Sequence, residues 1–160
     1  MSSSRRRAQT AVEAMFIIAV ILTGVALIVP SYLRSSTVST MDVYVRDAAS
    51  SACDYLNEGV FVIDSMHQPL NVVLTYTNGS YAFFSFKGIN VVENGGEVGV
   101  TVYIGTGVSF TPTQLSVVED KIKEYILRYI SSRPNVRREG DYLYMGEKRF
   151  TITVNVGDNL

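Results

Sequence analysis

The sequence has almost none of the residues on which disulfide, metal and redox chemistry depend. It contains one cysteine, Cys53, one histidine, His67, and no tryptophan. A single cysteine excludes an intramolecular disulfide and a zinc site built from several cysteines. Histidine chemistry is limited in the same way to one residue. If the chain is exported, it therefore has to fold without covalent cross-links.

Charged residues are also scarce, and neither sign dominates. Of the 160 residues, 18% are charged and 47% are hydrophobic, and the formal net charge is −1. An average soluble domain has about a quarter of its residues charged. Because there is no basic excess, we expect no nucleic-acid partner. The length suits one globular domain with a tail.

No catalytic or metal-binding arrangement is visible in the sequence. His67 falls in a predicted loop with only Asp64 nearby, which indicates a solvated histidine. The Gly105-Thr106-Gly107 stretch lacks the third glycine of a nucleotide-binding loop. Two further sets of charged residues are interpreted as solvated surface: the helical residues Glu119, Asp120, Lys121, Lys123 and Glu124, and the loop residues Arg133, Arg137 and Arg138. We therefore expect no enzyme, no metal and no cofactor.

The strongest pattern lies at the N-terminus, where a basic patch precedes an apolar run. Arg5-Arg6-Arg7 is followed by the run Ala14–Val29, which ends at Pro30. As a helix this run covers about 24 Å, and counting on through Leu33 brings it close to a membrane span. The arginines before the run predict a cytoplasmic N-terminus and place the rest of the chain outside.

Glu13 lies between the basic patch and the apolar run. A carboxylate inside a membrane span is unfavourable, so such a residue points to a function with a specific partner. If the chain were cut between Ala8 and Gln9, Glu13 would lie about one helical turn beyond the new α-amine. In a helical array it would be placed to neutralise the terminus of a neighbouring copy.

The segment Arg5–Pro30 resembles the class III signal peptide of type IV prepilins, especially the archaeal form with glutamine after the cut. The matching residues are the basic patch, Ala8, Gln9 and Glu13 as fifth residue after the cut, and Pro30 falls where bacterial pilins often carry a kinking proline. The resemblance implies cleavage between Ala8 and Gln9 by a prepilin peptidase, and assembly through Glu13 and Pro30. It also implies an assembly platform and identical or related pilin subunits as partners. The mature protein would form a cell-surface filament, with adhesion or attachment as its role, after a stage as a single-pass membrane protein.

Other interpretations of the N-terminus remain open. An uncleaved signal anchor carrying a surface binding domain explains the apolar run but not Glu13. A pseudopilin of a secretion or uptake machine would share the whole segment. A conventional secretory signal is disfavoured because Ile28–Leu33 offers no small-x-small cleavage site.

Beyond Pro30, where a kink or short break is expected, a second helical pattern begins. Apolar residues recur at steps of three and four, and Gly59 is a reasonable stop: Val38, Met41, Val45, Ala49, Ala52 and Leu56. Cys53 on this stretch is interpreted as a small buried residue, with a cross-link between subunits as the alternative. The predicted divisions are a leader 1–8, a transmembrane or filament-core helix 9–33, a stalk helix 34–59 and a β-rich head 60–160.

The head is predicted to be α+β, with a small antiparallel sheet and one amphipathic helix. Two hairpins are expected, one at Asn78-Gly79 between strands 70–77 and 81–86, and one at Asn94-Gly95-Gly96 between strands 90–92 and 99–104. Thr111, Pro112 and Gln114 predict a helix start with a capping box, and this helix ends before Pro134. A last hairpin joins strands 141–145 and 149–156 at Gly146-Glu147.

Asn78-Gly79-Ser80 also matches the acceptor pattern for N-glycosylation. A glycan would suit an exposed hairpin tip on an exported protein. The turn explains the Asn-Gly pair without a sugar, so both interpretations stay open.

Overall fold

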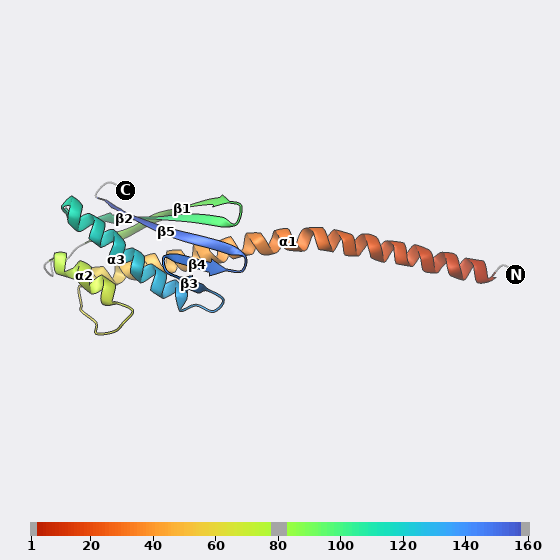
Figure 1. Cartoon of the computed structure of the whole chain (residues 1–160), viewed down its shortest axis with the longest axis horizontal. Coiled ribbons are helices and arrows are strands. Elements are labelled where there is room, and N and C mark those ends of the chain that lie inside the picture. The colour runs from red at the N-terminus through yellow and green to blue at the C-terminus, as the bar shows by residue number, and fades with distance from the viewer. Residues whose placement is uncertain (1–2, 78–82, 158–160) are drawn as a thin grey trace. The chain divides into compact units, whose positions relative to one another are not determined.

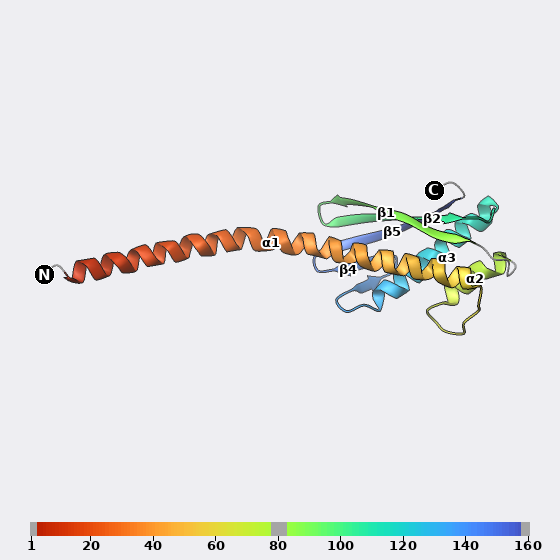
Figure 2. The same ribbon diagram turned by 180° about the vertical axis from the view of Figure 1, so that it is seen from behind.

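The computed structural model describes residues 3–77 and 83–157, without the side chains of residues 3–11 and 30–35. The chain divides into two compact units, Met1–Val38 and Ser39–Leu160. Helix α1 (Ser3–Glu58) supplies the described structure of the first unit and continues into the second. The second unit holds the other elements (Figures 1 and 2): α2 (Gln68–Tyr76), β1 (Phe84–Asn94), β2 (Glu97–Thr106), α3 (Pro112–Ser131), β3 (Arg137–Glu139), β4 (Tyr142–Met145) and β5 (Lys148–Gly157).

The fold is α+β with a long N-terminal apolar helix, as predicted. Helix α1 is not interrupted at Pro30, so the predicted short break is absent. The helix ends at Glu58, one residue before Gly59, whose φ of +67° favours glycine. The helical face predicted from the sequence is confirmed, because Met41, Val45 and the apolar residues that follow them at helical spacing are buried.

The sheet is mixed, and the prediction of an antiparallel sheet was wrong. Its five strands lie in the order β1-β2-β5-β4-β3. Strand β5 pairs in parallel with β2 and antiparallel with β4. The parallel pair arises because the chain leaves β2, crosses over through α3 and the β3–β4 hairpin, and returns beside β2 in the same direction. Local turn signals do not reveal such a crossover.

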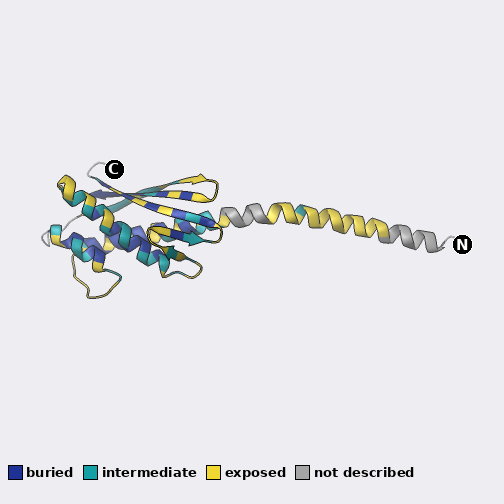
Figure 3. Ribbon diagram, in the orientation of Figure 1, coloured by how far each residue is buried: buried dark blue, intermediate teal, exposed yellow. Residues whose placement is uncertain are grey.

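Strands β2 and β5 have one buried and one exposed face, visible as alternating colours in Figure 3. Their buried residues are in register across the parallel pair, with Val98 opposite Phe150 and Val102 opposite Val154. The intervening Thr151 and Thr153 are exposed. A period of two of this kind places all the apolar residues of a strand on one face. Buried residues of α1 and α3 complete the core: Met41, Val45, Ala49, Ala52, Leu56, Val118, Ile122, Ile126 and Ile130.

Residues 68–76 form helix α2, and the prediction of a strand over 70–77 was wrong. Leu70, Val73 and Leu74 are buried at helical spacing, and Pro69 lies in the first turn, where a missing N–H is tolerated. The β-branched and aromatic residues favour a strand locally, but burial of this face overrides that preference. The predicted hairpin therefore has no strand as its first arm, and its Asn78-Gly79 turn lies outside the described residues.

The strands predicted separately over 81–86 and 90–92 are parts of one strand, β1, whereas several other local predictions are confirmed. Thr111 and Gln114 form a reciprocal capping box at the start of α3, and this helix ends at Ser131, before Pro134. Gly95 and Gly146 have φ values of +63° and +60° in the two predicted turns. Left-handed backbone of this kind is nearly free of strain only for glycine.

Candidate assembly surfaces

The apolar part of α1 is exposed on every side within the first unit. The segment Val12–Val29 spans 18 residues with a mean hydropathy of 2.7, and none of it is buried. By length and composition this helix is able to cross a membrane, and a signal sequence near an N-terminus has the same properties. Figure 3 shows the segment as exposed along nearly all of its length, and Gly24 is the residue of intermediate exposure. Its surface requires lipid or protein as a cover.

The polar groups within this segment are few. Thr23 donates its hydroxyl hydrogen to the carbonyl oxygen of Ala19 at 2.8 Å, so this hydroxyl is satisfied inside its own helix. Internal satisfaction of this kind is what a lipid environment demands. Glu13 is the only charged residue of Val12–Val29, and it lies exposed at the N-terminal end. The apolar surface therefore begins at a carboxylate.

For the other residues of the predicted cleavage and assembly sites, the structure describes the backbone alone. The backbones of Ala8, Gln9 and Pro30 belong to α1, and their side chains lie outside the description. Asn78 lies outside the described residues altogether. The predicted pairing of Glu13 with the α-amine of a neighbouring copy stays a prediction.

Within the second unit, a polar cluster fastens α1 to α3. Tyr129 donates a hydrogen bond of 2.7 Å to the Asp47 carboxylate, which also accepts one of 2.7 Å from Arg133. The Arg133 guanidinium lies over the rings of Tyr129 and Tyr44, with 4.7 Å and 5.7 Å to the ring centroids. Cation–π contacts of this geometry add to the ion pair. Arg133 is therefore structural.

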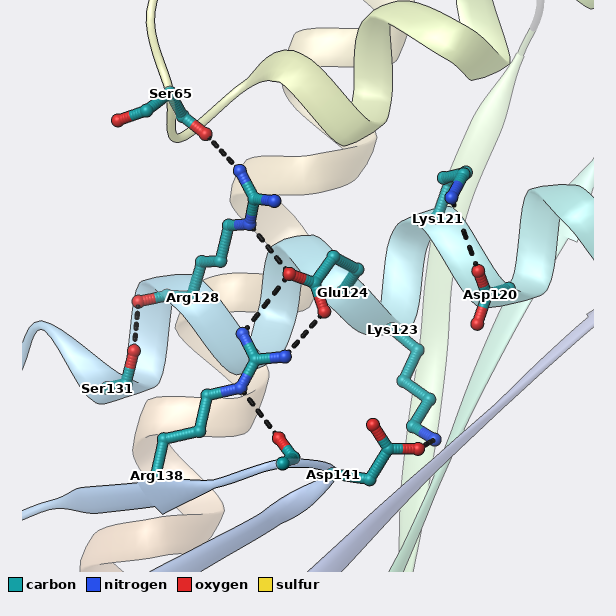
Figure 4. Close-up of polar contacts among 10 residues, drawn as sticks. Ser65, Asp120, Lys121, Lys123, Glu124, Arg128, Ser131, Arg138 and Asp141 are labelled. Atoms are coloured by element: carbon teal, nitrogen blue, oxygen red, sulfur yellow. Dashed lines mark hydrogen bonds and ion pairs between the residues drawn. The ribbon is translucent and has the colours of Figure 1, made fainter.

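A second cluster fastens α3 to the β3–β4 hairpin and to the loop before α2 (Figure 4). Glu124 accepts hydrogen bonds from Arg138, at 2.6 Å and 3.2 Å, and from Arg128 at 2.7 Å. These contacts, those of Arg138 first, hold the pKa of Glu124 below its ordinary value, against the opposing effect of burial. Arg128 also donates to the carbonyl oxygen of Ser65. Lys123 pairs with Asp141 at 2.6 Å.

Of the three arginines interpreted as a solvated basic cluster, Arg137 is exposed as expected, whereas Arg133 and Arg138 are held in ion pairs with distant elements. Arg133 binds Asp47, Arg138 binds Glu124, and Arg137 pairs with Glu139 at 3.1 Å. The acceptors of Arg133 and Arg138 lie on α1 and α3, so the sequence gives little sign of them, whereas Glu139 lies two residues from Arg137 on the same strand β3. Each positive charge is balanced locally.

His67 is also more confined than the prediction of a solvated loop residue. Its ring stacks on Tyr55 with 4.5 Å between centroids, and its Nδ1 lies 2.7 Å from Oδ2 of Asp64. The backbone N–H of His67 donates to the other Asp64 oxygen at 2.7 Å. This backbone hydrogen bond, followed by the ring contact, lowers the pKa of Asp64. The pair closes the loop that leads into α2.

The loop between α1 and α2 displays a feature that the sequence reasoning missed. Val60, Phe61, Val62 and Ile63, named here the apolar loop, are all exposed. They belong to the segment 60–160 predicted to be β-rich, but they form neither strand nor helix. A signal was present, because four apolar residues lie between the helix stop Gly59 and the turn-forming Asp64.

Cys53 is buried inside the second unit, which confirms the interpretation as a small buried residue. It is 4% exposed, and burial raises the pKa of its thiol to about 12. No group of three or more histidine, cysteine or acidic residues able to hold a metal occurs among residues 3–77 and 83–157.

Comparison with known proteins finds no match: no family model, no curated protein and no solved structure is similar to this chain.

Proposed function

We propose that this chain is a structural subunit of the type IV pilin kind, which polymerises into an extracellular filament through its N-terminal apolar helix. The observation that carries the proposal is Glu13 at the N-terminal end of Val12–Val29, a helical segment that has no other charged residue and no buried one. A helix that served only as an anchor would gain nothing from this carboxylate. A subunit that assembles gains a charge partner for the α-amine of a neighbour.

The rest of the N-terminus supports the same proposal. The basic Arg5-Arg6-Arg7 and the Ala8-Gln9 pair stand where a prepilin peptidase would cut, on the cytoplasmic side. Cleavage there leaves the apolar helix attached, so it holds the subunit in the membrane first and packs against identical or related subunits afterwards. The head is then displayed on the cell surface for attachment.

The first experiment is mass spectrometry of the protein recovered from the surface. A mature chain is expected to begin at Gln9. A chain that still begins at Met1 would contradict processing of the pilin kind.

The second experiment replaces Glu13 by Ala, with Glu13→Gln as the matched polar control. Both variants should insert into the membrane. Both should be incorporated into filaments at least tenfold less than the unchanged protein, because neither carries the negative charge that pairs with the α-amine of a neighbour. A normal filament yield from Glu13→Ala would contradict the proposed role of this carboxylate in assembly.

A second candidate function is a surface binding domain that is anchored and never polymerises. The observation that favours it is the self-contained core of Ser39–Leu160. Purified material separates the two candidates: filaments seen by electron microscopy support the first, and monomers that stay in the membrane support the second.

A further inference from the structure

The apolar loop is unusual for a surface segment. Four consecutive apolar residues are exposed, and Ile63 has a relative exposure of 105%, which means that its side chain stands clear of the protein. Single exposed apolar residues are common on protein surfaces, whereas contiguous ones mark interaction sites.

The loop is also held in place by side chains that bind its backbone. The N–H of Val62 donates to the hydroxyl oxygen of Tyr55 at 3.0 Å, and its carbonyl oxygen accepts from the Asn71 amide at 3.0 Å. The Tyr55 hydroxyl in turn donates to Asn71 at 2.5 Å. With the peptide groups of Val62 fixed by α1 and α2, Phe61 and Ile63 are displayed in a defined conformation. A surface organised before binding loses less entropy when a partner arrives.

We propose that the apolar loop packs against the head of a second copy of this chain in the assembled filament, an inference that rests on the proposed function. Four side chains offer much less than the roughly 800 Å² per partner that a stable two-protein interface needs. The loop therefore suits a contact between copies that another interface already holds together. The exposed helix Val12–Val29 is such an interface, and it raises the effective concentration of one head near the next.

The charges around the loop argue against a lipid surface as the occupant. From Asp47 to Phe86 the chain has no lysine or arginine, and its acidic residues are Asp47, Asp54, Glu58 and Asp64. Arg128 of α3 reaches the carbonyl oxygen of Ser65 near the loop, but its charge is paired with Glu124. Anionic membranes attract basic segments and repel acidic ones. A protein surface without a strong negative field fits this loop better.

The direct test is a photo-cross-linking amino acid placed at Ile63 in the full chain. In intact filaments we expect Ile63 to cross-link to a second copy, with the attachment site identified by mass spectrometry. Val92 on β1, which is also well exposed (60%), is the matched control position. Cross-links from Ile63 to lipid or to other proteins alone would overturn the proposal.

The energetic test replaces two apolar side chains together, Phe61→Ser with Ile63→Ser. The double variant should reach the membrane at the normal level and polymerise, but its filaments should break under shear to lengths several-fold shorter. Asn71→Ala, which frees the loop and keeps its apolar surface, should give an intermediate length, and Val92→Ser should change nothing.

The outcomes separate this inference from the proposed function. Normal filament length for the double variant would overturn the role of the loop and leave the filament proposal standing. Equal shortening by Val92→Ser would also overturn it, because the effect would not belong to the loop. If the unchanged protein forms no filaments, both proposals fall together.

Discussion

Tyr129 on α3 donates its hydroxyl hydrogen to the carboxylate of Asp47 on α1 across a distance of 2.7 Å and a separation of 82 residues. Arg133 completes the cluster by binding both the Asp47 carboxylate and the Tyr129 oxygen at 2.7 Å. A single carboxylate thus ties the part of α1 that lies in the second unit to the amphipathic helix. The surrounding core aligns the same two helices.

Tyr129→Phe removes this hydrogen bond and the one that Arg133 donates to the Tyr129 oxygen, and it keeps the ring beneath Arg133. We expect the free energy of unfolding to fall by about 1–3 kcal/mol, because each hydrogen bond contributes about 0.5–1.5 kcal/mol net. Urea unfolding followed by circular dichroism would measure it. In a double-mutant cycle with Asp47→Ala, the two effects should be clearly non-additive. Strict additivity would contradict a direct coupling.

Asn57 near the end of α1 pairs with the backbone of Phe84 at the start of β1. Its amide donates to the Phe84 carbonyl oxygen at 2.8 Å, and its carbonyl oxygen accepts from the Phe84 N–H at 2.7 Å. Asn57→Ala leaves both groups of Phe84 without these partners, so we expect a loss of about 1–3 kcal/mol in unfolding free energy.

Asn57→Asp is the informative control for this pair. It keeps an acceptor for the Phe84 N–H and sets a carboxylate against the Phe84 carbonyl oxygen. The amide of Phe84 should therefore keep its protection from hydrogen exchange, although the protein is destabilised. Full protection at Phe84 in Asn57→Ala would show that the side-chain bonds matter little.

The Glu124 cluster predicts a dependence of stability on pH. Its folded-state pKa is lowered from the ordinary value of 4.5, so the stability it contributes is complete above that value. The contribution is lost as the pH falls through the lowered folded-state pKa, because a protonated carboxyl no longer attracts Arg138 and Arg128. Glu124→Gln should thus be less stable than the unchanged protein at pH 7, and the difference should shrink towards zero in acid. Urea midpoints at several pH values would test this, and a constant difference would contradict it.

We expect the thiol of Cys53 to react only when the protein unfolds. Its burial and a pKa of about 12 keep it in the unreactive thiol form at neutral pH. Labelling by a maleimide should therefore be at least a hundredfold slower than in the urea-unfolded chain. A variant with Cys53→Ala and Ile63→Cys should label at once. Rapid labelling of Cys53 in the folded protein would restore the alternative of a cross-link between subunits.

Much of the fold follows from local sequence signals. The end of α1 at Gly59, the capping box of Thr111 and Gln114, and the two glycine turns were predictable because each depends on residues close in the chain. The helical faces were predictable for the same reason, since a period of three to four is visible within one segment. The apolar run that ends at Val29 and the position of Glu13 before it can be recognised from the sequence without the structure.

Other features depended on contacts between distant segments. The strand predicted over 70–77 is helix α2 because Leu70, Val73 and Leu74 meet the core at helical spacing. The parallel pairing of β2 with β5 depends on a crossover that no turn motif encodes. Arg133 and Arg138 find their acids on other elements, at Asp47 on α1 and Glu124 on α3.

The sequence by itself determined that this protein has an uncharged apolar run directly after Glu13, a basic patch before it and an α+β head. Local periodicity and charge placement act over a few residues, so they can be recognised without a fold. Only the tertiary structure decided that Tyr55 and Asn71 hold the backbone of Val62, and that the side chains of Phe61 and Ile63 are exposed. That arrangement requires α1, α2 and the loop to meet in space, and no pattern along the chain specifies such a meeting.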